Sequence, residues 1–490
     1  MRLKHRILCL MICWLAMGVE GIAQTFTLQQ FQQLVWEQAT RMPSYYSLQA
    51  ARAESRLTQL RALPQVTLVS EPLNLNRQNV LRYNAVIDAD EYRNQQLIRN
   101  SLDLRIDQRV DALGGVLSIQ SGLSRLLSTT GPNTILNYGV TPVQLRWTQD
   151  FGTLGEAARE QRELALSLDL AQKEFFQEAA DQVKEISLAY LEAWSLQDGI
   201  ASTTIRLQQR DTLLNIQDRQ LEQGFSDLSQ RLLLEQLILE DSLLLMDQLA
   251  QFDDACYLLF QRGIKPVSSE NWRLDQPDLP GSGFVALPRI DTFVARNSVA
   301  GAQARVDLFS LVREVRTRKL KALPQLSVFG GIGTNRFSSD PWWTATNPFI
   351  PQQYLNIELS IPIWSWGINQ LQVQQSSWSV MARQMAFEQT QQAEAQRINQ
   401  LINAYNRVRP KLDILLKLEK IREVQYQLTL KKWTLGQSSV QEFYEATQQW
   451  KHSEQEYFAL LREAWETYLS LQSVLLLDPI SLTPLPLAEE

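Results

Sequence analysis

Hydrophobic and polar positions alternate over residues 354–363. Leu355, Ile357, Leu359, Ile361 and Ile363 share one face, and Tyr354, Asn356, Glu358, Ser360 and Pro362 share the other. A period of two predicts a β-strand with one apolar face. A run of about ten residues is long enough for one tilted strand that crosses a membrane. The edge of a soluble sheet gives the same pattern, so alternation alone leaves both interpretations open.

Aromatic residues lie at both ends of this predicted strand. The connection before it contains Trp342, Trp343 and Phe349, and Trp364 and Trp366 follow it. Aromatic girdles at the two membrane interfaces have this arrangement. The aromatic residues therefore favour the membrane interpretation.

A similar but less regular pattern occupies residues 101–150. Leu102, Leu104 and Ile106 alternate with charged residues. Val143 and Leu145 alternate with polar residues before Gly152. These runs predict further strands between about 101 and 150. Residues 70–100 have no clear period, and we expect an irregular connector there.

The rest of the chain has helical periodicity. Residues 153–223 consist mainly of strong helix formers and would make a rod of about 105 Å. Leucines at a seven-residue step predict a coiled-coil stripe along it: Leu207, Leu214 and Leu221. An antiparallel helix should return with a stripe of Leu232, Leu239, Leu243 and Leu249. In the second half, residues 368–435 and 438–476 repeat the pair, and Pro410 should kink or divide the outgoing helix.

Three landmarks recur in the same order and indicate a duplication. Ala62-Leu63-Pro64-Gln65 recurs as Ala322-Leu323-Pro324-Gln325; Asp150-Phe151-Gly152 corresponds to Ser365-Trp366-Gly367; and Leu221-Glu222-Gln223-Gly224 corresponds to Trp433-Thr434-Leu435-Gly436. The expected organisation follows from these landmarks: repeat one at 24–262, with a helical hairpin at 152–262; a Pro- and Gly-rich linker at 263–288; repeat two at 289–478, with a β-hairpin at 324–364 and a helical hairpin at 367–478; and a tail at 479–490.

The expected fold is mixed α and β, with duplicated long antiparallel coiled-coil helices and four membrane β-strands per chain. Four strands cannot close a barrel, and lipid does not tolerate an open sheet edge. The chain should therefore share a barrel with copies of itself. A trimer would form a 12-stranded β-barrel that the helices continue as an α-helical barrel.

Composition and charge exclude several classes of protein. The net charge of -6 argues against nucleic-acid binding, and three Cys and two His argue against a disulfide scaffold or a zinc domain. Residues 1–23 have a positive start, a short apolar run and a small-residue cleavage site, which predicts a secretory signal peptide. Cleavage leaves Cys256 and His452, which we interpret as a packing residue and a solvated residue.

No catalytic or cofactor motif is apparent. The chain contains no nucleophile elbow, no metalloprotease motif and no Cys/His metal spacing. Gly330-Gly331-Ile332-Gly333 vaguely resembles a phosphate loop but lacks the following Lys-Ser/Thr. No later segment is apolar enough for a transmembrane helix. We expect no catalytic residue, no metal site and no cofactor.

The ordered set of junctions at Pro64, Gly152, Pro324 and Gly367, with the turns at Gly224 and Gly436, resembles the TolC family of outer-membrane efflux proteins. The resemblance covers nearly the whole mature chain. It implies a passive outer-membrane duct with porin activity, whose helical stalk lies in the periplasm. It also implies a homotrimer, a periplasmic adaptor protein, an inner-membrane pump of the RND or ABC type, and contact with outer-membrane lipid.

The same resemblance suggests site residues. The adaptor would dock on the helical tips at Leu221, Gly224, Asp227, Leu228, Leu435, Gly436, Ser439 and Val440. Glu442 and Glu445 would point into the pore entrance, although solvated charges on a helix surface have the same sequence pattern. An alternative function is a periplasmic coiled-coil structural or adhesion protein anchored in the outer membrane. Cargo cannot be predicted, since a shared duct needs few specific contacts.

Overall fold

The structure is a computed structural model. It describes residues 24–84, 88–130, 133–223, 227–261, 272–281, 283–286, 290–435, 437–483 and 485. The predicted signal peptide at 1–23 lies outside these residues, as does much of the linker predicted at 263–288. The chain divides into two compact units, and each contains parts of both sequence halves. Unit 1 comprises residues 1–46, 172–301 and 389–490, and unit 2 comprises residues 47–171 and 302–388.

Helices make up most of the described chain. The α-helices are α2 (Leu28–Glu37), α3 (Pro43–Arg61), α4 (Glu156–Glu222), α5 (Leu228–Phe260), α6 (Ile290–Asn297), α7 (Val299–Lys321), α8 (Ile368–Thr434) and α9 (Val440–Leu475), with 3-10 turns η1 (Ala39–Arg41) and η2 (Phe151–Thr153). None of the described helices combines the length and apolarity needed to cross a membrane.

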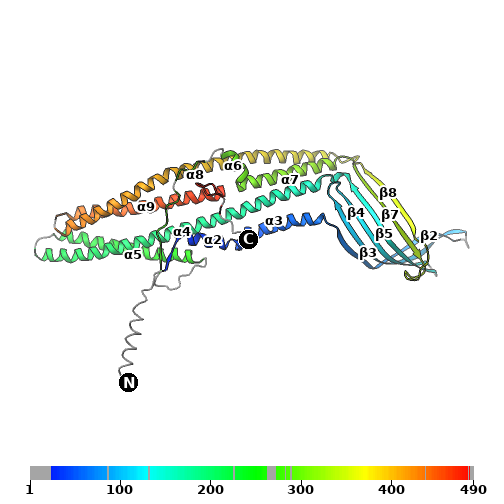
Figure 1. Cartoon of the computed structure of the whole chain (residues 1–490), viewed down its shortest axis with the longest axis horizontal. Coiled ribbons are helices and arrows are strands. Elements are labelled where there is room, and N and C mark those ends of the chain that lie inside the picture. The colour runs from blue at the N-terminus through cyan, green and yellow to red at the C-terminus, as the bar shows by residue number, and fades with distance from the viewer. Residues whose placement is uncertain are drawn as a thin grey trace, which may run out of the picture. The chain divides into compact units, whose positions relative to one another are not determined.

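Unit 2 contains an antiparallel sheet whose strands lie side by side (Figure 1). Its order is β2 (Gln65–Asn84), β3 (Ala89–Val110), β4 (Gly115–Thr130), β5 (Asn133–Asp150), β7 (Gln325–Ser338) and β8 (Ile350–Ser360). Unit 1 contains a short parallel pair of β1 (Gln24–Phe26) and β6 (Trp272–Leu274). The predicted combination of helices and strands is confirmed.

The sheet has six strands, so the prediction of four strands per chain is wrong. Residues 70–100 are not an irregular connector, because they form most of β2 and β3. A bulge between Glu71 and Asn74 shifts the register of β2 by one residue and inverts the phase of its alternation. This inversion interrupts the alternation of β2, whereas residues 89–100 of β3 pair without a shift but are mostly polar on both faces.

The two faces of the sheet differ in polarity. Cross-strand neighbours on one face, which we call the apolar face, are Val66, Ile106, Ile119, Leu145 and Ile332. The adjacent row on the opposite, polar face is Thr67, Arg105, Gln120, Gln144, Gly333 and Gln352. Side chains of the apolar face are largely uncovered; Val66 is 64% and Ile332 57% exposed. Such a sheet needs an apolar medium on one side and a polar one on the other.

The duplicated landmarks have the same structure in both halves. Each Leu-Pro-Gln segment, at Pro64 and at Pro324, separates the end of a helix from the first residue of a strand. Each long outgoing helix, α4 and α8, has 67 residues. The helix α8 is continuous through Pro410, so the expected division does not occur.

Two buried tyrosines at corresponding places connect the long helices to other segments of unit 1. The hydroxyl of Tyr190 donates hydrogen bonds to the carbonyl oxygens of Phe26 (2.8 Å) and Asp275 (2.7 Å). The hydroxyl of Tyr405 donates to the carbonyl oxygen of Pro280 at 2.9 Å. Both side chains are fully buried. These bonds satisfy backbone groups of the N-terminal strand and of the segment between the repeats.

The predicted return stripe on α5 is not a packing stripe within the chain. Leu232, Leu239, Leu243 and Leu249 are all exposed, whereas Leu234 and Leu237 are buried. The buried positions face α4 and the other helices of unit 1, and the stripe read from the sequence lies on the opposite side of the helix. Its apolar side chains therefore stay about half to two-thirds exposed in the single chain.

Candidate functional site

The tip of the first helical hairpin lies between α4 and α5. Leu221 is half-buried near the end of α4, and Leu228 begins α5 with 54% of its surface exposed. Asp227 precedes α5 as its N-terminal cap residue and accepts a hydrogen bond from the Ser229 hydroxyl at 2.6 Å. This bond lowers the pKa of the Asp227 carboxyl. Gly224, which we predicted at this turn, lies outside the described residues.

The second tip, between α8 and α9, is capped more fully. Ser439 is the N-cap of α9, and its hydroxyl accepts a hydrogen bond from the backbone N–H of Glu442 at 3.2 Å. The Glu442 carboxylate accepts in return from the backbone N–H of Ser439 at 3.4 Å. This reciprocal arrangement is a capping box, which begins the helix at Val440. Gly436 lies outside the described residues, and Leu435 is 71% exposed.

Glu442 and Glu445 are both exposed on the first turns of α9. The hydroxyl of Ser438 donates to the Glu442 carboxylate at 2.6 Å, and this bond is the main cause that lowers the pKa of Glu442. The side-chain amide of Gln441 donates to Glu445 at 2.9 Å. Glu442 thus has a structural role in capping as well as a charge available at the tip.

An aromatic stack fixes which way the two glutamates point. The ring of Phe443 stacks on Trp433 at 5.5 Å, and the ring of Tyr426 stacks on Trp450 at 4.8 Å. Phe443 is fully buried between α8 and α9. Because Phe443 occupies the inner side of the helix, Glu442 and Glu445 on the outer side are directed to solvent.

Farther along the same helices, a group of buried charges lies among α4, α5 and α9. Asp241 accepts ion-pair contacts from Arg210 at 2.6 Å, Arg206 at 3.3 Å and Lys451 at 3.4 Å. Arg206, Arg210 and Asp241 are each at most 2% exposed. Burial lowers the pKa of Arg210, and the Asp241 carboxylate partly compensates. Loss of one partner would leave an uncompensated charge in the interior.

Glu454 of α9 lies at the border of this group. Its carboxylate is 3.8 Å from the Arg206 guanidinium and 12% exposed. Burial raises the pKa of Glu454 to about 7, and the attraction of Arg206 only partly offsets this. The negative charges of Asp198 and Glu419 also raise the pKa of Glu454. Glu454 therefore changes charge near neutral pH.

Sequence reasoning missed the buried charge group. Its signal was present: Arg206 and Arg210 are four residues apart and share the side of α4 that carries Thr203 and Leu213, both of them buried. A charged residue within a stripe of buried positions needs a buried partner. The partner Asp241 is on another helix, so the pair could not be identified without the fold.

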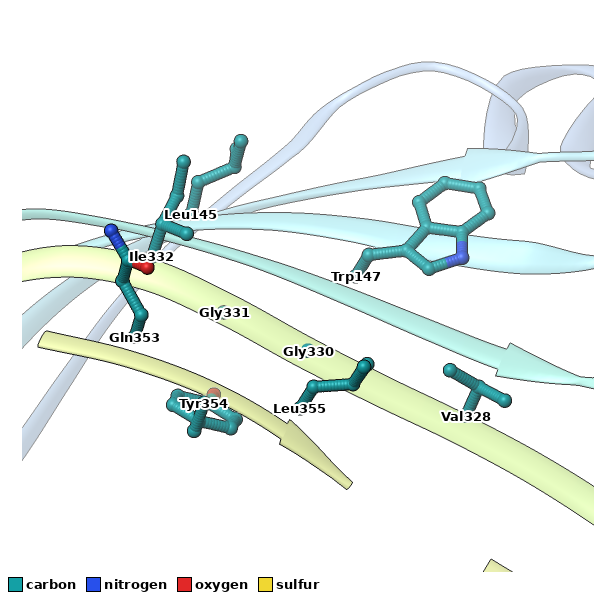
Figure 2. Close-up of a pocket in the computed structure, with 9 residues that line it drawn as sticks. All are labelled: Leu145, Trp147, Val328, Gly330, Gly331, Ile332, Gln353, Tyr354 and Leu355. Carbon is teal, nitrogen blue, oxygen red and sulfur yellow. The ribbon is translucent and has the colours of Figure 1, made fainter. Parts of the chain in front are cut away.

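A shallow hollow of about 560 Å³ occurs on the sheet. Figure 2 shows Gly330 and Gly331 of β7 between the side chains of β5 and those of β8. The ring of Tyr354 lies against Gly331, and its hydroxyl accepts a hydrogen bond from Arg146 at 3.0 Å. These glycines are in a strand, so the resemblance of Gly330-Gly331-Ile332-Gly333 to a phosphate loop is not supported.

Comparisons with known proteins relate this geometry to one family. The sequence profile of the family described as "Outer membrane efflux protein" matches residues 294–475. A comparison with curated protein sequences found no match. The fold of the chain is thus the stronger source of information on its first half.

Solved structures of outer-membrane channels have the same fold. The MtrE outer membrane channel of Neisseria gonorrhoeae aligns with a TM-score of 0.61 and 14% identity, over 91% of this chain and 88% of that one. The CmeC outer membrane channel of Campylobacter jejuni aligns with a TM-score of 0.60 and 12% identity, over 91% and 85%. The outer membrane protein VceC of Vibrio cholerae gives 0.58 and 13%, over 91% and 96%. The expected resemblance to outer-membrane efflux proteins is confirmed, and the matched channel structures share the fold of this chain.

Replacement of Glu454 by Gln should flatten the pH dependence of stability. A carboxyl whose pKa is raised in the folded state stabilises the fold below its ordinary pKa of 4.5, and this contribution is lost as pH rises through about 7. We expect the wild type to lose about 1–3 kcal/mol more than the variant between pH 4.5 and 8. Thermal unfolding of the detergent-solubilised protein measures this. Glu463→Gln, at an exposed position of the same helix, is the control; an identical pH slope in wild type and Glu454→Gln would contradict the assignment.

Proposed function

Because residues 294–475 match the outer membrane efflux protein family and the chain has the fold of its channels, we propose that this protein is the outer-membrane exit duct of a tripartite efflux or secretion system. The observation that carries the proposal is the two-faced sheet of unit 2, which joins an exposed apolar face to a polar one. Nothing in the described residues favours the alternative of a structural or adhesion protein.

The aromatic residues near the sheet support a membrane location. Trp343 is 77% exposed on the connection between β7 and β8, and Trp364 and Trp366 are exposed beyond the end of β8. The rings of Trp364 and Trp366 contact each other edge-on at 5.3 Å. Exposed tryptophans at both ends of an apolar band are typical of the two membrane interfaces. The band between them would lie in outer-membrane lipid, with the helices in the periplasm.

The duct is passive in this proposal. Transport energy would come from an inner-membrane pump of the RND or ABC type, connected through a periplasmic adaptor. Among the described residues, no group of His, Cys, Asp or Glu is arranged to hold a metal ion. The proposal needs no cofactor and no catalytic residue, because the chemistry of transport resides in the partner.

Exposed apolar stripes on two helices of unit 1 support self-association. On α8 the exposed residues Ile414, Ile421 and Leu428 follow a seven-residue step, which Leu435 continues directly after the helix. On α5 a matching step connects Leu232, Leu239 and Met246. Each of these side chains is more than half exposed within the chain. Such a heptad seam is stable only when another helix covers it.

A second copy of the chain can supply that cover. The helix α5 starts at its tip and α8 ends at its tip, so the two stripes run antiparallel when the tips of two copies lie at the same level. Rotational symmetry of a trimer would bring each α8 stripe against the α5 stripe of a neighbour. The homotrimer is therefore proposed with these stripes as its helical interface.

The two helical tips would bind the adaptor and surround the periplasmic entrance of the pore. Leu228 and Leu435 offer exposed apolar contacts close to the capped helix starts at Asp227 and Ser439. In a trimer, Glu442 and Glu445 from three copies would place six carboxylates around the opening. A ring of this kind attracts cations and repels anions. Lys432 attracts Glu442 as well, which moderates the charge at this point.

Membrane fractionation and planar-bilayer recordings test the duct itself. We expect the protein in the outer-membrane fraction, as a heat-resistant trimer that produces discrete conductance steps after reconstitution. A monomer that stays in solution without detergent would overturn the proposal.

Charge introduced into the heptad seam should disrupt the trimer. Ile421→Glu and Leu239→Glu place carboxylates in an interface that would be apolar, and each should shift the population to monomers in native electrophoresis. The matched control is Glu423→Gln, which changes a charge on α8 without adding one to the seam. Trimers of unchanged stability in both stripe variants would show that the seam is not the interface.

Removal of the tip carboxylates should change ion selectivity. Glu442→Gln with Glu445→Gln should move the reversal potential in a salt gradient toward that of an unselective pore, by an amount that rises as salt is lowered. Glu442→Gln keeps a side chain able to complete the capping box, so α9 should still begin at the same place. Unchanged selectivity would assign both residues to the outer surface of the tip.

A further inference from the structure

The hairpin β2–β3 is a continuous part of the sheet. It pairs with β4 without interruption from Gln95 and Thr130 to Val110 and Gly115. The chain enters the hairpin at Gln65 and leaves it at Val110, which lie at the same end of the sheet. The hairpin therefore adds two strands beside β4 and β5 and leaves the connections of the other strands unchanged.

The apolar face of the sheet continues onto the part of this hairpin that lies before the bulge at Glu71; beyond it, Arg77 and Asn79 lie on the same face, opposite Gln96 and Asn94. Leu68 of β2 lies opposite Leu104 of β3, and Leu102 lies opposite Leu123 of β4. Leu68 is 67% exposed, as much as Leu355 of β8 at the other edge. A peripheral flap in water would not be expected to keep an uncovered apolar face in register with its neighbours.

The polar face continues as well. Asp107 of β3 accepts a hydrogen bond from the Ser118 hydroxyl of β4 at 2.5 Å, and Asp103 accepts from the Gln120 amide at 3.2 Å. The Asp103 carboxylate lies over Gly122, in space that a larger residue would fill. Side chains of both charge signs, including Arg105, thus line this part of the polar face.

Both edges of the six-stranded sheet lack a partner in the chain. In the sheet order, β2 pairs only with β3, and β8 only with β7. Since every neighbouring pair is antiparallel, β2 and β8 run in opposite directions, and the β2 of one copy can pair with the β8 of the next. Unpaired backbone groups are not tolerated in lipid.

We infer that β2–β3 is an additional membrane hairpin and that three copies of this chain close an 18-stranded barrel instead of one of 12 strands. This inference rests on the proposed function. The diameter of a barrel grows roughly linearly with the number of strands, so the outer-membrane lumen would be about 1.5-fold wider. A closed wall of 16–18 strands leaves an open aqueous channel. The barrel would therefore admit bulky hydrated cargo, and size selection would fall to the helical tips.

Paired cysteine substitutions test whether the hairpin is part of the wall. In a Cys256→Ser background, Arg105→Cys and Leu104→Cys probe adjacent positions on opposite faces of β3, and Glu358→Cys and Leu359→Cys are the matched pair on β8. A membrane-impermeant maleimide added to trimers in vesicles should label the Arg105 and Glu358 positions at least tenfold faster than the Leu104 and Leu359 positions.

The two pairs separate the inference from the proposed function. Labelling that alternates on β8 but is equal at the two β3 positions would overturn the wider barrel and leave the duct intact. Loss of alternation on β8 would overturn the duct itself.

Lumen width is tested with maleimides attached to polymers of increasing size. Labelling of Glu358→Cys from the outer side should extend to larger polymers in the full chain than in a chain that lacks residues 65–114. Joining Pro64 to Gly115 removes only β2 and β3, and alternation at residues 358 and 359 would verify that the shortened chain still forms a barrel. The same polymer limit in the two chains, or an electron cryomicroscopy map of the full trimer with 12 strands, would refute the inference.

Discussion

The structure depends on one constraint: backbone N–H and C=O groups at a sheet edge must be hydrogen-bonded where water is absent. The single chain does not meet it, since β2 and β8 are both unpaired on their outer sides. The helices of unit 1 also leave surface uncovered, because they carry exposed apolar heptad stripes that include Ile421 and Leu239. In the proposed trimer, neighbouring copies would pair the sheet edges of unit 2 and cover the apolar stripes of unit 1.

The two halves of the chain share one order of helix, strand and long helix, as expected for a duplication. Both halves pass from a helix through Leu-Pro-Gln into a strand, and both continue with a helix of 67 residues. The corresponding tyrosines, Tyr190 and Tyr405, donate to carbonyl oxygens of segments outside the long helices. The halves differ in the number of strands between these landmarks, because the first half has β2 to β5 and the second has β7 and β8.

Exposed and buried charged groups have different roles in this structure. At the tip, Glu442 caps α9 and still presents its charge to solvent, so the same side chain serves the fold and the proposed ring of carboxylates. In the interior, Asp241 gathers Arg206, Arg210 and Lys451, and the cost of desolvation is offset only while all partners stay in place. That group connects α4, α5 and α9, whereas exposed pairs such as that of Arg231 with Glu235 add little to stability.

The sequence by itself determined the class of fold, the duplication and the positions of the tips, because periodicity, proline and N-cap residues act over a few neighbouring residues. It also indicated the family to which the second repeat is similar. Tertiary structure alone decided that residues 70–84 and 89–100 belong to strands, since the alternation of β2 changes phase at the bulge after Glu71 and β3 is defined by its pairing with β2 and β4. It alone decided which side of α5 is buried and which residue balances Arg210. Those outcomes depend on contacts between segments far apart in the chain, which the hydrophobic pattern of neighbouring residues does not predict.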